Sequence, residues 1–166
     1  MKTIVVYQSS TGFTKQYAQW IAEDLKCQAV SLKEVSEQAI RENECIIFGG
    51  WIMGGMINGL DKVLKMNPKQ LVVFAVGASP EKLTDTAEMK KQNHIEDKEL
   101  FYLVGGFRFS ELNFMIRAML KTMKKSAAKK EDKTPQDQFM ADTLGTSFDN
   151  SDRTYITPLV TCVKEK

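Results

Sequence analysis

A group of hydroxyl-bearing residues lies between the first apolar run of the chain, Thr3–Tyr7, and a segment of helical spacing that begins at Thr14. Helix N-termini offer unpaired backbone N–H groups and the positive end of the helix dipole, so they attract anions. Serine and threonine hydroxyls add neutral donors, which suits a dianionic phosphate without any lysine. A turn that only capped the helix would need one hydroxyl. This loop has four hydroxyls in six residues, so we predict a phosphate site at Ser9, Ser10, Thr11, Gly12, Phe13 and Thr14.

Other chemistries have little support in the sequence. The hydroxyl-rich loop lacks the lysine of a nucleotide-hydrolase P-loop, and no GxGxxG segment is present for a dinucleotide. His94 is the only histidine and lies among polar residues, so no Ser/His/Asp set is available and we expect its side chain to be exposed. Asp137, Asp149 and Asp152 lack the spacing of calcium or magnesium ligands. We therefore predict neither a hydrolytic triad nor a metal site.

Five apolar runs alternate with segments of helical spacing, which predicts βα units around a parallel sheet. The last three runs are apolar at consecutive positions, as is typical of strands that are covered on both faces. The runs are Thr3–Tyr7, Ala29–Leu32, Cys45–Gly49, Leu71–Val76 and Leu100–Val104. Helices are expected at Thr14–Leu25, Glu34–Arg41, Leu60–Met66, Pro80–Asn93 and Thr157–Val163, the last with Thr157 as its N-cap.

The length of 166 residues fits one domain. We expect residues 1–166 to fold as a unit, with a long helical insertion at about 107–153 before the C-terminal helix. Within it, helices are expected at Leu112–Lys125 and Pro135–Leu144. The methionines of the first, Met115, Met119 and Met123, are expected to fill gaps in a core. The three cysteines are expected to be reduced, buried thiols.

The loop Ser9–Thr14 resembles the flavodoxin family, whose phosphate loop reads Ser/Thr-x-Thr-Gly-x-Thr directly after the first strand, and it matches at every specified position. The resemblance implies an α/β, flavodoxin-like fold: a three-layer α/β/α sandwich with a five-stranded parallel sheet of order 2-1-3-4-5. It also implies FMN at the carboxyl ends of the strands, at the switch point between the first and third strands.

The resemblance further assigns two loops to the flavin ring, one after the third apolar run and one after the fifth. Glycines in both loops would let the backbone lie close to a flat ring. Trp51 could stack on the ring or simply pack at a strand end. Phe107 or Phe109 could flank the ring, while Arg108 could offset charge on the reduced flavin, meet an acidic substrate group or be solvated. The expected contacts are Gly50, Trp51, Ile52, Met53, Gly54, Gly105, Gly106, Phe107 and Arg108.

Within the flavodoxin-like group, the closer resemblance is to the menaquinone-dependent protoporphyrinogen oxidase type. It rests on Gly105–Phe109, followed by a basic, Met-rich helix through Lys125. It implies an FMN-dependent oxidoreductase acting on a quinone or a porphyrin-like substrate. Two features depart from that type: Thr11 is the residue of electron-carrier flavodoxins, and the long segment is more polar.

Two alternatives remain open. One is a flavodoxin-like electron carrier that docks to a redox partner, although such carriers are usually strongly acidic and this chain has a net charge of +2. The other is a binding module of the same fold without FMN, against which the intact phosphate loop argues.

Composition and charge indicate a soluble globular protein, with 43% hydrophobic and 27% charged residues. The sequence has neither a signal-like N-terminus nor a run of about 18 apolar residues, so a cytoplasmic location is expected. Lysines crowd the stretch Lys121–Lys133. They form either a solvated helix face or a peripheral contact with a membrane surface. No nucleic-acid partner is predicted.

Overall fold

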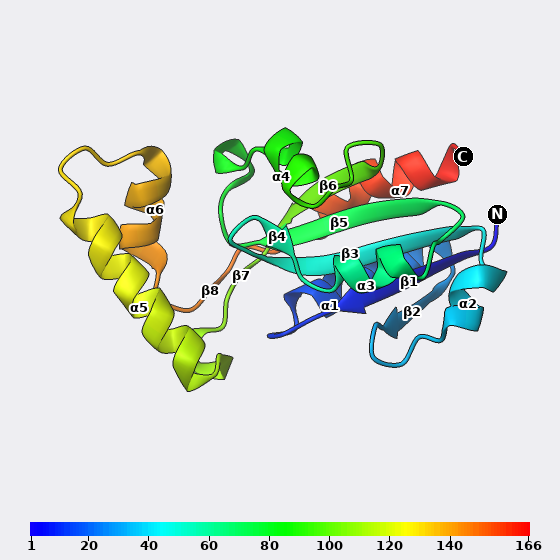
Figure 1. Ribbon diagram of the computed structural model, residues 1–166, viewed down its shortest axis with the longest axis horizontal. Helices are drawn as coiled ribbons and strands as arrows, with labels where there is room; N and C mark the ends of the chain where they lie inside the picture. The colour runs from blue at the N-terminus through cyan, green and yellow to red at the C-terminus, as the bar shows by residue number, and fades with distance from the viewer.

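Five parallel strands form the centre of the protein in a computed structural model that describes residues 1–166 (Figure 1). Their order across the sheet is β2-β1-β3-β5-β6, which in chain order is 2-1-3-4-5, with a short strand β4 added antiparallel to β3. The predicted flavodoxin-like sheet is therefore confirmed. The strands are β1 (Thr3–Gln8), β2 (Gln28–Ser31), β3 (Cys45–Met53), β4 (Met56–Ile57), β5 (Leu71–Gly77) and β6 (Glu99–Val104).

Helices cover both faces of this sheet and complete the three layers. Successive strand residues point to opposite faces, so Val5 joins one hydrophobic core while its neighbours Ile4 and Val6 join the other. The first core is closed by α1 (Phe13–Leu25) and α7 (Thr157–Lys164). The second is closed by α2 (Glu37–Glu42), α3 (Leu60–Lys65) and α4 (Thr86–Gln92).

Three predicted helix starts differ from the structure. The helix predicted from Glu34 begins at Glu37, after Ser36, whose side chain accepts from the Ala39 N–H. The segment predicted as one helix from Pro80 contains a 3-10 turn, η1 (Glu81–Leu83), and α4 starts only after Asp85, whose carboxylate accepts from the Glu88 N–H at 3.0 Å. Before α7, a 3-10 turn, η3 (Arg153–Ile156), runs directly into the helix. Thr157 is therefore the first helical residue and not the N-cap.

Between β6 and α7 the chain leaves the sheet as a helical hairpin made of α5 (Phe114–Lys129) and α6 (Pro135–Thr143). A two-stranded ribbon, β7 (Gly106–Phe107) paired with β8 (Phe148–Asp149), carries the hairpin, and a 3-10 turn, η2 (Phe109–Glu111), lies between β7 and α5. Figure 1 shows the two helices packed against each other at one end of the molecule, beyond the ends of the strands. None of the helices is long and apolar enough to cross a membrane.

The methionines of α5 do not fill a core, so that prediction is wrong. Met115, Met119 and Met123 are 80%, 41% and 39% exposed. The physical reason is that the hairpin projects beyond the sheet. Met115 therefore faces solvent, while Met119 and Met123 border open space between the hairpin and the sheet. The cysteine prediction holds in part: all three thiols are free, but only Cys45 is fully buried, while Cys27 and Cys162 are half-buried.

Asp137 holds the two helices of the hairpin together. Its carboxylate accepts from Lys130 Nζ at 2.6 Å and from the Thr134 N–H at 3.1 Å, which completes a capping box at the start of α6. The hydrogen bond from Lys130 is the main reason that the pKa of Asp137 falls to about 2. The ionised Asp137 carboxylate therefore contributes its full stabilisation of the fold above the ordinary carboxyl pKa of about 4. This contribution is lost as the pH falls towards 2.

Tyr17 joins α1 to both ends of the excursion that carries the hairpin. Its side chain is fully buried, its hydroxyl donates to the Val104 carbonyl at the end of β6, and it accepts from the Asp152 N–H at 3.1 Å. Burial raises the pKa of this phenol to about 12, so the hydroxyl keeps its proton through neutral pH. The two ends of the segment that carries the hairpin are thus both fixed by one buried hydroxyl group.

We expect Tyr17→Phe to lower the free energy of unfolding by about 1–3 kcal/mol, because it leaves the buried Val104 carbonyl and the partly buried Asp152 N–H without their partner. Chemical denaturation monitored by circular dichroism measures the change. Tyr155→Phe is the matched control, since the Tyr155 hydroxyl makes no hydrogen bond, and it should cost less than about 0.5 kcal/mol. Equal effects of the two substitutions would contradict the role of Tyr17.

Candidate functional site

A cavity of about 490 Å³ opens at the carboxyl ends of the strands, between the sheet and the helical hairpin. This volume lies within the range of roughly 300–1,000 Å³ that is usual for small-molecule sites. Loops that follow β1, β3, β5 and β6 line it, together with residues of α4, α5 and α6. Of its 32 lining residues, 18 are hydrophobic, so the cavity suits a ligand with a substantial apolar part.

The predicted phosphate loop forms one wall of this cavity and retains free donors. Gly12, with φ of 100°, makes the left-handed turn into α1, and its N–H donates to Ser9 Oγ at 3.1 Å. The N–H groups of Ser10, Thr11, Phe13 and Thr14 have no acceptor within the protein. Thr14 is 1% exposed and lines the cavity, yet its hydroxyl makes no hydrogen bond. A hydroxyl on the cavity wall and a helix start without partners are the donors that an anion would use.

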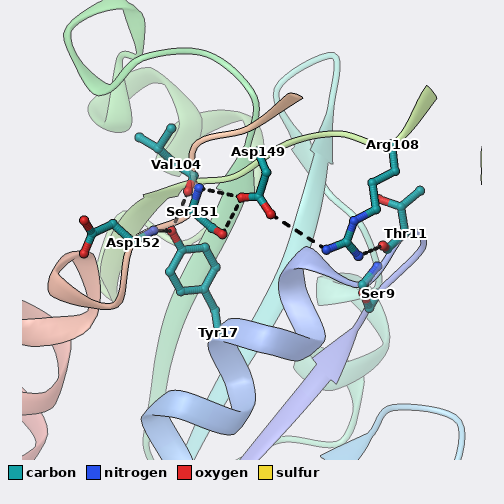
Figure 2. Close-up of polar contacts among 9 residues, drawn as sticks. Ser9, Thr11, Tyr17, Val104, Arg108, Asp149, Ser151 and Asp152 are labelled. Carbon is teal, nitrogen blue, oxygen red and sulfur yellow. Dashed lines mark hydrogen bonds and ion pairs between the residues drawn. The ribbon is translucent and has the colours of Figure 1, made fainter. Parts of the chain in front are cut away.

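Arg108 supports the phosphate loop from behind. Figure 2 shows its side chain reaching from the segment after β7 to Thr11, whose carbonyl accepts a hydrogen bond from Nη1. The guanidinium carbon lies 4.4 Å from the centroid of the Phe13 ring, a cation–π contact. Asp149 Oδ2 lies 3.9 Å from Arg108 Nη2. Because both side chains are partly exposed, this ion pair adds little to stability. Arg108 therefore fixes the loop backbone and places a positive charge beside it, and it does not line the cavity.

The end of β3 brings Trp51, Ile52 and Met53 to the cavity wall, and the turn after it adds Gly54. Gly50 lies behind this wall, where a Cβ atom would meet the Asn58 carbonyl oxygen at 2.5 Å. The glycine therefore permits β4 to fold back on β3.

Asn93 holds the same loop in place, and the sequence analysis did not single it out. This buried amide accepts from the Ile57 N–H and donates to the carbonyls of Gly55 and Met89, each at 2.8 Å. Its partners are backbone groups that lie more than thirty positions away or within its own helix. No pattern of residues in the sequence could therefore predict them. The adjacent His94 is exposed, as expected.

The loop after β6 contributes Gly106 and Phe107 to the cavity, whereas Gly105 lies behind it against Val76. A side chain at Gly106 would collide with the Phe148 carbonyl, so this glycine permits the β7–β8 pairing. The Phe107 ring meets the Phe148 ring edge to face, with centroids 5.6 Å apart.

The structure thus brings together in one cavity most of the residues chosen from the sequence: Ser9, Ser10, Thr11, Phe13, Thr14, Trp51, Ile52, Met53, Gly54, Gly106 and Phe107. Gly12, Gly50, Gly105 and Arg108 support the wall from outside. The residues chosen from the sequence did not include Ile116, Gln136, Phe139 and Met140, with which the hairpin supplies a further wall. They also did not include Tyr102, whose hydroxyl donates to the Ser79 carbonyl at 2.6 Å and whose pKa is raised to about 12 by burial.

Comparison with known proteins identifies the family. The model of a family described as a flavodoxin domain matches residues 4–134, and the chain belongs to this family. No curated protein matches the chain.

Several solved structures are similar in part. A flavodoxin from the domain Archaea has 25% sequence identity and a TM-score of 0.45, over 61% of this chain and 78% of that chain. Oxidised flavodoxin 2 from Bacillus cereus has 17% identity and a TM-score of 0.45, over 63% and 86%. A flavoprotein from Lactobacillus acidophilus NCFM in complex with FMN has 12% identity and a TM-score of 0.42, over 61% and 90%.

We expect Asn93→Leu to loosen the loop between β3 and β4, because it removes the oxygen that accepts from the Ile57 N–H and the N–H groups that donate to the carbonyls of Gly55 and Met89. Amide hydrogen exchange at Ile57 should become about tenfold faster or more, for the loss of at least one net hydrogen bond. Asn58→Leu is the matched control, since this neighbouring amide is exposed and makes no side-chain hydrogen bond. Unchanged exchange at Ile57 would show that Asn93 does not hold the loop.

Proposed function

We propose that the cavity binds FMN and that the protein is an FMN-dependent oxidoreductase. The observation that carries the proposal is the set of unpartnered donors at the start of α1, above all the Thr14 hydroxyl, which lines the cavity. These donors fit a terminal phosphate, and they lie in a largely apolar cavity that fits a ring system. Membership of the flavodoxin domain family supports the same cofactor. Bound FMN would supply electron-transfer chemistry.

The residues of this chain would each contribute binding or positioning. Ser9–Thr14 would hold the phosphate, while Trp51–Gly54 and Gly106–Phe107 would border the ring. Arg108 would keep the Thr11 carbonyl turned back towards the β7 segment. The helices α5 and α6 would exclude water from the far side of the cavity.

An enzyme is favoured over an electron carrier by the hairpin and by the charge. A carrier exchanges electrons with a protein partner, so its flavin edge must be reachable by that partner. Here the helical hairpin adds an apolar wall to the cavity, which suits a small-molecule substrate. The net charge of +2 also lacks the acidic bias that helps carriers to dock. A protoporphyrinogen oxidase-type reaction, which follows from the resemblance of Gly105–Phe109, is the most specific form of the proposal.

We expect Thr14→Val to weaken FMN binding by about ten- to a hundredfold, the worth of one hydrogen bond to a charged group. The substitution keeps the shape of the side chain and removes only the hydroxyl. Quenching of flavin fluorescence during titration measures the dissociation constant. Thr161→Val on the exposed side of α7 should leave it unchanged. Equal FMN affinity of the wild type and Thr14→Val would contradict the phosphate site.

We also infer that the outer face of α5 touches anionic membrane surfaces. Phe114, Lys121 and Lys125 are seven and four positions apart, so they share one face of the helix, and all three are exposed. Phe114 is 77% exposed, which is unusual for an aromatic side chain. An aromatic residue beside lysines on one helix face is typical of contact with the interface of a bilayer.

Phosphatidylserine vesicles should therefore retain the protein at low salt and release it as the salt concentration rises. Reversing two lysines, Lys121→Glu with Lys125→Glu, should weaken this association at least about tenfold, since each lysine near the surface contributes about 1 kcal/mol. Lys33→Glu with Lys69→Glu changes the net charge equally at exposed sites elsewhere and should have a smaller effect. Absence of sedimentation with vesicles at low salt, or equal loss in both variants, would exclude this contact.

A further inference from the structure

The hairpin wall of the cavity has an apolar surface of its own, distinct from the phosphate loop. Ile116, Met119 and Met123 recur at helical spacing along the inner face of α5, and α6 adds Phe139 and Met140. Methionine side chains adapt to ligands of different shape. The wall therefore suits the face of an apolar ring compound.

One polar atom on this wall has no partner. Gln136, on α6, donates from Nε2 to Ser79 Oγ at 3.2 Å, which links the hairpin to the end of β5. Its other side-chain atom, Oε1, is buried and accepts no hydrogen bond. A buried carbonyl oxygen without a donor is unfavourable, and a ligand with a hydroxyl or N–H group would relieve it.

The part of the cavity beside Gln136 and the hairpin wall is called the hairpin end here. The charges around it disfavour the binding of anions. No lysine, arginine or histidine lines the cavity, although lysine and arginine total 23 of 166 residues. Its only charged lining residues are the acidic Asp85 and Glu88, both exposed on the α4 side. A carboxylate placed here would lose hydration and face like charge. A neutral ligand avoids both costs, and a cationic ligand, which also loses hydration, is attracted by the two carboxylates.

The hairpin end also lies apart from the phosphate loop. The phosphate loop follows β1 and Ser79 follows β5, and β3 lies between these strands. Two strand spacings correspond to about 10 Å. The two ends of the cavity can therefore hold different chemical groups.

We propose that the hairpin end of the cavity binds a second ligand, a neutral or cationic ring compound that donates a hydroxyl or N–H hydrogen bond to Gln136 Oε1. This inference rests on the proposed function, because such a ligand would be the co-substrate of the FMN-loaded protein. It also sets a limit on porphyrin-like substrates, whose carboxylates would have to remain outside this end.

The test uses three bicyclic probes of nearly equal size: 2-naphthol, which can donate a hydrogen bond, 2-methoxynaphthalene, which cannot, and the anion 2-naphthoate. Isothermal titration of the FMN-loaded protein should show 2-naphthol binding at least about tenfold more tightly than either of the others. Methyl NMR resonances of Met119 and Met123 should shift on binding, whereas that of the distant Met1 should not. Equal affinity for 2-naphthol and 2-naphthoate would overturn the proposal.

Gln136→Leu should abolish the preference for 2-naphthol over 2-methoxynaphthalene. Gln138→Leu is the matched control on the same helix, because its amide is exposed and points to Asp142, and it should keep the preference. Met119→Lys adds a cation to the wall and should shift the preference towards 2-naphthoate. Retention of the 2-naphthol preference in Gln136→Leu would overturn the assignment of Gln136 Oε1 as the acceptor. A loss of FMN affinity in that variant would overturn it as well, since Gln136 would then contact the cofactor.

Failure of the two proposals can be told apart. FMN titration is carried out first, and absence of FMN binding would reject the proposed function alone. The three probes are then titrated into the FMN-free protein as well. Selective binding of 2-naphthol there, with the Met119 and Met123 shifts, would keep the second-ligand proposal. Absence of selectivity in both forms would reject it.

Discussion

The buried hydroxyl of Tyr17 bonds to Val104, where the chain leaves the sheet, and to Asp152, just before it returns in α7. Everything between these points, from β7 to β8 with the helical hairpin, is an excursion of the connection between β6 and α7. A long excursion can occupy a defined place only if its two ends are fixed relative to each other, because free ends leave it many conformations. The Tyr17 contacts and the β7–β8 pairing supply that constraint. The cavity depends on it, since one of its walls is the hairpin.

The same excursion also reaches the phosphate loop. Arg108 follows β7 and donates to the Thr11 carbonyl, so the segment that carries the hairpin and the loop that follows β1 are held together although they are distant in the sequence. A change in the position of β7 would move Arg108 and with it the backbone of Ser9–Thr14. The structure therefore gives a physical route by which the hairpin and the phosphate loop can affect one another, through one guanidinium group and the backbone it contacts.

Positive charge is distributed unevenly over the hairpin. The lysines of α5 lie towards solvent, whereas its apolar face and the inner face of α6 border a cavity without any cationic residue. One helix thus presents a basic surface to its surroundings and an apolar surface to the site. The amphipathic spacing of α5 produces this division. It explains why Met119 and Met123 are partly exposed, since they border the cavity.

The sequence by itself determined the five parallel strands, their order through the resemblance of Ser9–Thr14, and the place of the phosphate loop. These features depend on residues that are consecutive or regularly spaced, so their pattern is visible in the chain. Only the tertiary structure decided what Asn93, Arg108 and Gln136 do. Each acts on groups far away in the sequence, the first two on backbone atoms and the third on Ser79. Backbone atoms are the same in every residue, so no spacing of side chains can reveal such partners before the chain has folded.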